Sequence, residues 1–306
     1  MKKYPSEIFG YYWQNNSPEA KSNRKKHFCP FHDSTCFKQS RLIDFPFGVC
    51  TAHYDGAELA LCPRRFLENA TVFRDIAKHH FKNINDILVF SEVGLKGIGN
   101  FDFVMIKHKP MSIEIEDFVV IEFQTGQTTS TGKLVEAFSE YLNTGHFNQK
   151  LSYGFGINSY DIWKRSFAQI LNKGIILEKW KKKIYWVVQD QIFQYFQKKY
   201  RLNTLKYHDS HSTIFALYDF KKTESSLALY QTRIFSSTID DLFNAFRQND
   251  EIPPVEEFIS RIQTKIQKDM NLSLRLDVES TKKYIDTPKP SSTGRIKDDS
   301  KEFGVS

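Results

Sequence analysis

Apolar and polar positions follow a strand-like pattern through the middle of the chain. Residues 87–91, 101–107 and 117–124 predict three strands, and the third is almost continuously apolar, as strands in the middle of a sheet are. Glycines in residues 92–99 predict a connection between the first two strands. Apolar residues at helical spacing predict a helix over residues 133–142.

The same alternation of strand and helix patterns continues toward the C-terminus. The further predicted elements are helices over residues 158–172, 191–200, 239–247 and 254–267, and strands over residues 184–189, 213–218 and 228–231. Together these elements predict an α/β fold, a mixed sheet flanked by helices. Residues 276–306 are polar and rich in Pro, Ser and Lys, which predicts a disordered tail.

Composition and charge narrow the class of protein. With 306 residues, 40% of them apolar and 15% aromatic, the chain can bury the core of one large or two modest domains. The formal charge of +7 is compatible with a polyanionic partner without proving one. Neither a membrane-spanning stretch nor a leader peptide is visible, so we expect a cytoplasmic protein with no membrane partner.

All four cysteines fall in one short window near the N-terminus. They are Cys29, Cys36, Cys50 and Cys62. Four thiolates satisfy a tetrahedral Zn or Fe ion, so the window predicts a structural metal site. The spacing contains no CxxC pair, and His27, His32 and His53 lie close enough in sequence to replace one thiol. Free thiols are one alternative; disulfides are a weaker one, because cytoplasmic thiols stay reduced.

Polar side chains interrupt the third predicted strand near its end. Glu122 and Gln124 share one face of it, because side chains alternate along a strand. Asp102 lies on the preceding strand and approaches Glu122 if the two strands are neighbours. Two adjacent carboxylates repel each other unless a cation lies between them, and Mg²⁺ is the natural partner for oxygen ligands. The alternative is that Glu122 and Gln124 are exposed polar residues at the edge of a sheet.

Several of these segments together resemble one enzyme family. The segments are "CPF" at Cys29, "GVC" at Cys50, "CPRRF" at Cys62, the stretches "SEVGLKG" and "FDFV", and "IEFQ" running into "QTT". The acids alone resemble the PD-(D/E)XK nuclease motif. The whole combination, over about residues 25–135, resembles the NotI/EagI-like type II restriction endonucleases.

The resemblance implies a fold, an activity and a set of site residues. It implies a PD-(D/E)XK core over residues 71–275 and a four-cysteine metal-binding subdomain over residues 1–70. It implies a Mg²⁺-dependent homodimer that cuts both strands of double-stranded DNA at a short palindrome, by analogy GC-rich, leaving 5′-phosphate and 3′-hydroxyl ends. A cognate DNA methyltransferase would be its genetic partner. The implied roles are metal-binding carboxylates for Asp102 and Glu122, the position of the superfamily's lysine for Gln124, a supporting acid for Glu92, and structural Fe or Zn ligands for Cys29, Cys36, Cys50 and Cys62.

DNA contacts are predicted from basic and hydroxyl-bearing positions. The candidates are Lys96, Arg64, Arg65, Lys181 and Lys182 for phosphates, and Thr125, Gln127 and Thr128 at the start of a helix. The alternatives are solvated lysines and helix-capping hydroxyls. Two other functions fit the same residues: a repair or structure-specific nuclease, and a metal-stapled DNA-binding module without catalysis.

Overall fold

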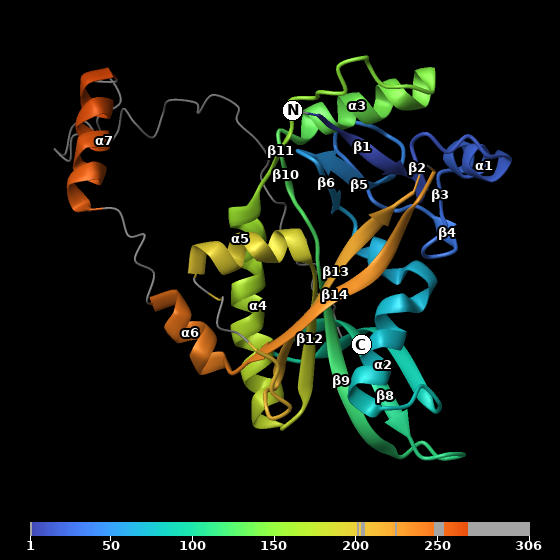
Figure 1. Ribbon diagram of the computed structural model, residues 1–306, viewed down its shortest axis with the longest axis vertical. Coiled ribbons are helices and arrows are strands. Elements are labelled where there is room, and N and C mark those ends of the chain that lie inside the picture. The colour runs from blue at the N-terminus through green and yellow to red at the C-terminus, as the bar shows by residue number, and fades with distance from the viewer. Residues whose placement is uncertain (1, 201, 203–205, 224, 248–253, 269–306) are drawn as a thin grey trace, which may run out of the picture. The chain divides into compact units, whose positions relative to one another are not determined.

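A computed structural model describes residues 2–200, 202, 206–223, 225–247 and 254–268 (Figure 1). Met1–Asp250 form one compact unit and Glu251–Ser306 a second. In the second unit the structure describes helix α7 (Val255–Lys268), close to the predicted 254–267. The predicted tail over residues 276–306 lies outside the described residues. None of the helices in the described part of the chain is long and apolar enough to cross a membrane.

A six-stranded mixed sheet forms the centre of the first unit. Its order is β14-β13-β12-β9-β8-β7, with β12 parallel to both β9 and β13 and the other pairs antiparallel. The strands are β7 (Ile87–Leu95), β8 (Gly99–His108), β9 (Ile115–Gln124), β12 (Lys183–Gln189), β13 (Thr213–Lys222) and β14 (Leu227–Ser237). β12 lies inside the sheet, and its residues from Ile184 to Gln189 are all buried. The α/β class expected from the sequence is confirmed.

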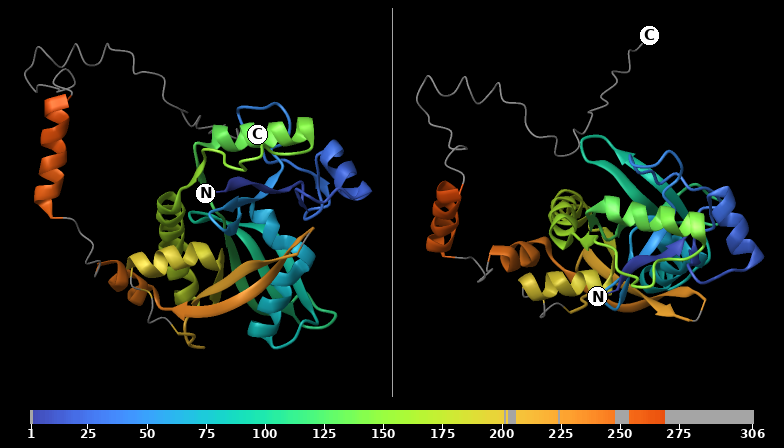
Figure 2. Two further views of the ribbon diagram at one scale, coloured as in Figure 1. Left: turned by 45° about the horizontal axis from the view of Figure 1, so that its top comes forward. Right: turned by 90° about the horizontal axis from the view of Figure 1, so that it is seen from above.

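Helices cover both faces of this sheet (Figures 1 and 2). On one face, α2 (Thr71–Phe81) and the 3₁₀ segment η1 (Pro63–Ala70) share a core with alternate residues of the strands, including Ile121 and Val187. The opposite face, with Val120 and Trp186, packs against α4 (Ser159–Lys179), α5 (Asp190–Tyr200) and α6 (Ile239–Arg247). Because β9 and β12 are covered on both faces, their sequences read as nearly continuous apolar runs.

A second, smaller sheet is built from the N-terminal residues. Its order is β2-β1-β5-β6, with β1 (Lys3–Ile8), β2 (Tyr11–Tyr12), β5 (Val49–Tyr54) and β6 (Ala57–Ala60). Around it lie α1 (Pro18–Lys26), the short pair β3 (Phe28–Cys29) and β4 (Ser34–Thr35), and the pair β10 (Thr128–Thr129) and β11 (Gly156–Ile157).

Helix α3 (Thr131–Thr144) completes this N-terminal part, although it comes from the middle of the chain. Leu134 and Phe138 of α3 pack with Ile8 and Phe47 in a third buried cluster. The chain therefore leaves the central sheet after β9, covers the small sheet, and returns to form α4. The compact unit Met1–Asp250 therefore contains both the small sheet and the central sheet.

Candidate active site

Asp102 and Glu122 meet where β8 and β9 stop pairing. The ladder between the strands ends at the pair Phe103 and Ile121. Beyond it, side chains replace the ladder: the Phe123 amide donates to Asp102 Oδ2 over 2.8 Å, and the Asp102 amide donates to Glu122 Oε1 over 3.4 Å. The expected approach of the two acids is therefore present. The strands diverge at this point, and both carboxylates are held by backbone groups.

Burial raises the pKa of both carboxyl groups, and a neighbouring acid adds to each shift. Glu122 is 1% exposed, and burial followed by the charge of Asp102 raises its pKa to about 7, while Lys173 opposes the shift. Burial also raises the pKa of Asp102; the Phe123 amide and Lys173 oppose this, and Glu92 adds to it. A buried acid and a half-buried acid, each with negative charge nearby, form a site with affinity for a cation.

Glu92 lies in β7 and not in a connection, so this part of the sequence prediction is wrong. The strand extends to Leu95, and the turn to β8 occupies only residues 96–98. The pairs Ser91–Phe103 and Val93–Phe101 flank Glu92, which places it beside Asp102 in the ladder. Glu92 is exposed and has a φ of 54°, a left-handed conformation that is uncommon for a side chain of this size. Its carboxylate is thus a third acid near the pair.

Gln124 is oriented by α4. Its Oε1 accepts a hydrogen bond from Ser166 Oγ over 2.9 Å, and its Nε2 donates to Gln169 Oε1 over 2.8 Å. Gln124 therefore lies on the same side of the sheet as Glu122, as strand alternation predicts. With its amide held on both sides, Gln124 is a fixed neutral group at the end of β9.

Three site residues on α4 were missed from the sequence: Ser166, Gln169 and Lys173. The sequence carries a signal for two of them. The helix face that packs on the sheet includes Ile162, Ile170 and Leu177, all buried. The buried residues Ser166 and Lys173 interrupt this apolar face, whereas Gln169 is exposed. A polar side chain on a buried helix face requires a partner inside the protein.

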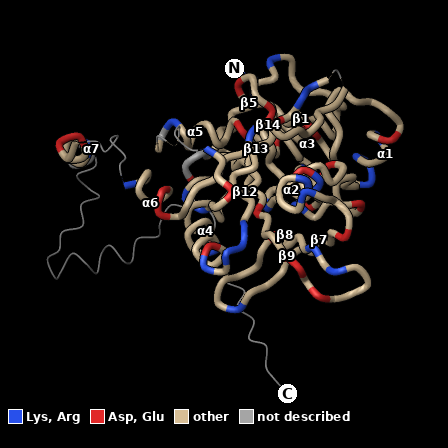
Figure 3. Tube along the Cα trace, turned by 60° about the horizontal axis from the view of Figure 1, so that its bottom comes forward, with Lys and Arg blue, Asp and Glu red and all other residues tan. Residues whose placement is uncertain are grey.

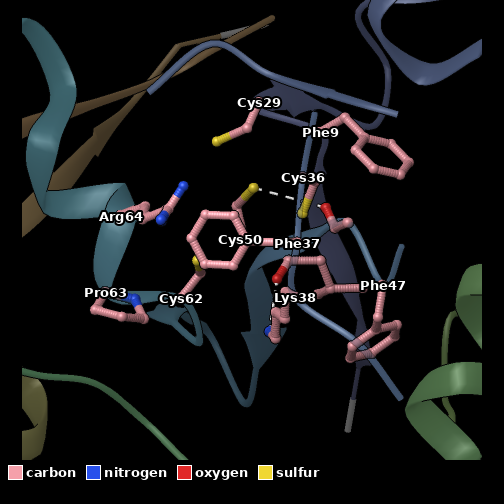
Figure 4. Close-up of a pocket in the computed structure, with 12 residues that line it drawn as sticks. Phe9, Cys29, Cys36, Phe37, Lys38, Phe47, Cys50, Cys62, Pro63 and Arg64 are labelled. Atoms are coloured by element: carbon pink, nitrogen blue, oxygen red, sulfur yellow. Dashed lines mark hydrogen bonds between the residues drawn. The ribbon is translucent and has the colours of Figure 1, made fainter. Parts of the chain in front are cut away.

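The four cysteines line one cavity of about 200 Å³ (Figure 4). All four are free thiols, so the disulfide alternative is not supported. Cys29 ends β3, Cys50 lies in β5, and Cys62 precedes η1. Figure 4 shows their sulfur atoms around a common space, with the Arg64 guanidinium at its border. Side chains that are well separated in sequence are thus gathered by the fold of the small sheet.

The four thiols match a metal site in donor type and number but not in how closely they converge. Burial raises the pKa of Cys29, Cys36 and Cys50, and other cysteines of the set add to each shift, because the thiolates would repel one another. Lys38 Nζ donates to the carbonyls of Val49 and Leu61, the residues just before Cys50 and Cys62. In the described residues, no three Cys, His, Asp or Glu side chains converge closely enough to hold one ion.

The predicted DNA-contacting residues near the active site are accessible to different degrees. Lys96 is exposed in the turn between β7 and β8, beside the strand that carries Glu92. Thr125, Gln127 and Thr128 are half-buried between β9 and α3. Thr128 Oγ1 bonds Thr131 Oγ1, which favours a role in shaping the start of α3.

The structure does not support the other predicted DNA contacts equally. Arg65 is fully buried, and the prediction that it reaches DNA is wrong. Arg64 lies over the ring of Phe37 at the cysteine cavity. Lys181 is exposed and Lys182 pairs with Asp117 over 2.6 Å, where α4 ends and β12 begins (Figure 3). Asp117 precedes Glu122 by five residues, so these lysines lie about 17 Å along the strand from the acids.

The site and the family comparison together define the class of protein. Adjacent acids with raised pKa values at the ends of two strands are typical of an enzyme active site. The chain matches the family described as Restriction endonuclease NotI over residues 15–231, more than half of its 306 residues. It belongs to the NotI restriction endonuclease family. It is a site-specific deoxyribonuclease, and its partner is double-stranded DNA. No curated protein matches the chain.

Proposed function

We propose that this chain is a type II restriction endonuclease of the PD-(D/E)XK type, with Asp102 and Glu122 as its Mg²⁺ ligands. The observation that carries the proposal is the meeting of the two carboxylates where β8 and β9 diverge. A divalent cation is the partner that allows both neighbouring acids to stay charged. Glu92, beside Asp102, would be the supporting acid.

Asp102, Glu122 and Gln124 would have different roles around a bound Mg²⁺. Such an ion lowers the pKa of a bound water and neutralises charge on the scissile phosphate. Asp102 is held in place by the Phe123 amide, and Glu122 by Lys173. Gln124 is neutral, so it would orient a water or a ligand and would not supply the charge that a lysine brings.

Cys29, Cys36, Cys50 and Cys62 would hold a structural Fe or Zn ion. Their shared cavity and their free thiols support this role. A four-thiolate site is closed to substrate and stabilises the fold around it. The ion would join the β3–β4 loop to the ends of β5 and β6.

The oligomeric state, the DNA site and the product ends are proposed by analogy with the family. The enzyme would act as a homodimer on a short palindromic, GC-rich site and leave 5′-phosphate and 3′-hydroxyl ends. A two-fold protein axis matches a palindrome. A cognate DNA methyltransferase would protect the host's own sites.

A digestion experiment tests the proposal. The purified chain is incubated with plasmid and phage DNA and Mg²⁺, and discrete bands are expected, with run-off sequencing giving the site and the ends. Asp102→Ala and Glu122→Ala should abolish cutting and leave specific DNA binding intact. Glu116→Ala, an exposed acid at the other end of β9, is the matched control. Smeared or junction-only products would favour a repair nuclease, and retardation without cutting would favour a DNA-binding module.

A further inference from the structure

An ammonium group lies against the proposed metal ligands. Lys173 Nζ, from α4, is 2.7 Å from each carboxylate oxygen of Glu122 and 2.7 Å from the carbonyl oxygen of Asn100. These three acceptors occupy the three N–H groups of the ammonium. The Lys173 side chain is 7% exposed, so it has no route to solvent that would satisfy it otherwise.

The packing of α4 brings Lys173 this close. Gly174 follows it, and a Cβ at that position would lie 2.6 Å from Ile239 Cδ1 and 3.3 Å from Thr213 Oγ1. The helix backbone therefore approaches β13 and α6 more closely than a larger residue would allow. On the other side, Lys173 Nζ lies 5.3 Å from the centre of the Phe101 ring, which places the ammonium beside β8.

The charges around Lys173 do not balance. Glu122 contacts it directly, and the charge of Lys173 also acts on Asp102. One cation thus faces two acids, and the exposed Glu92 adds negative charge beside Asp102. Breaking such a buried contact is costly, so Lys173 fixes the orientation of Glu122. A divalent cation at Asp102 and Glu122 would share the Glu122 oxygens with a positive group of like sign.

We propose that Lys173 is a positioning residue of the active site, which holds the Glu122 carboxylate in place and lowers the affinity of the site for a divalent cation. The inference rests on the proposed metal site at Asp102 and Glu122. The positively charged side chain near the acids would then come from α4, because position 124, where the superfamily has lysine, carries a neutral Gln.

Two readouts that should move in opposite directions test this role. Lys173→Met and Lys173→Gln remove the positive charge, and Lys173→Arg retains it. In the full chain without DNA, Mn²⁺ binding followed by electron paramagnetic resonance should tighten at least about tenfold in the Met and Gln variants. Their cleavage rate at saturating Mg²⁺ should fall about 10–100-fold, because Glu122 is no longer held. Lys173→Arg should keep the wild-type Mn²⁺ affinity. Lys133→Met, at an exposed position of α3, should change neither quantity.

The outcomes separate this inference from the proposed function. Mn²⁺ binding in the wild type that is lost in Asp102→Ala and Glu122→Ala establishes the metal site. Given that result, unchanged or weaker Mn²⁺ binding in a folded Lys173→Met or Lys173→Gln variant overturns the role of Lys173. Tighter binding in Lys173→Arg as well would also overturn it, because packing would then set the affinity. Absence of carboxylate-dependent binding in the wild type overturns the proposed site itself, and the inference with it.

Discussion

The sequence predicts that Arg65 contacts DNA, whereas the structure buries it in the protein. The variant Arg65→Met distinguishes a DNA-binding role from a structural one. The Arg65 guanidinium is fully buried and bonds Glu7 over 2.6 Å, Glu68 over 3.0 Å and the carbonyl of Leu227 over 2.7 Å. Glu7 belongs to β1 of the small sheet and Leu227 to β14 of the central sheet. The side chain therefore ties the two sheets together.

The expected loss of folding stability in Arg65→Met follows from the buried Glu7 carboxyl, which loses its partner. Glu7 is 2% exposed and would keep a buried carboxyl without its cation; burial already raises its pKa, and Arg65 opposes that shift. Breaking a buried ion pair on one side costs about 3–5 kcal/mol, a large part of the about 5–15 kcal/mol that stabilises a folded domain. At roughly 2–4 °C per kcal/mol, the melting temperature should fall by about 6–20 °C.

Urea unfolding measures the loss, with Arg74→Met on the exposed side of α2 as the control. The double variant Glu7→Leu, Arg65→Met should recover much of the stability, because removing both members of a buried pair is often nearly neutral. A loss below about 1 kcal/mol in Arg65→Met, within the range of surface substitutions, would refute the reasoning. The salt dependence of DNA binding gives a second check, since a lost phosphate contact would lower the slope by about one, and we expect no change.

Two further predictions concern the metal sites. Cys50→Ser removes one of four thiols from the shared cavity and should lose stoichiometric Fe or Zn, measured by elemental analysis, together with several degrees of melting temperature; wild-type protein without either metal would contradict the site. Gln124→Lys should retain metal binding and alter the ratio of cleavage rates in Mn²⁺ and Mg²⁺, because it places a charge where a neutral amide now bonds Ser166 and Gln169; an unchanged ratio, relative to Ser166→Ala, would contradict this.

The central sheet could be predicted from the sequence because its signals are local. β9 and β12 read as buried strands, since both of their faces are covered by helices. The strand residues from Glu92 to Leu95 could not be predicted, because β7 is the edge strand and its side chains are mostly exposed. Exposed residues and Gly94 imitate a loop, so the pattern ended the strand too early.

The core of the N-terminal part depends on contacts that sequence patterns do not report. Phe138 of α3 packs against Phe9 and Phe47, which are more than 90 positions away. The segment between the cysteines lacks strong helical periodicity, which favours a metal site over a large core as the feature that fixes it. In the structure, α3 supplies much of the missing apolar surface. This apolar core therefore stabilises the N-terminal part whether or not a metal is bound.

Asp102 and Glu122 could be predicted from the sequence, but their neighbour Lys173 could not, because it is distant in the chain. Asp102 and Glu122 lie on adjacent strands joined by a short connection, so strand alternation is enough to bring them together. Lys173 reaches Glu122 from a helix 51 positions later, where the backbone at Gly174 packs closely on Ile239 and Thr213.

Burial also changes how the net charge of the chain relates to DNA binding. Lys173 and Arg65 contribute to the formal +7, yet both are neutralised inside the protein by acids that they contact. Charge that attracts a phosphate backbone must come from exposed residues. Lys96 meets this condition, because it is exposed in the turn after the strand that carries Glu92. A phosphate held by Lys96 would lie near the end of β7, the strand that carries Glu92 beside Asp102.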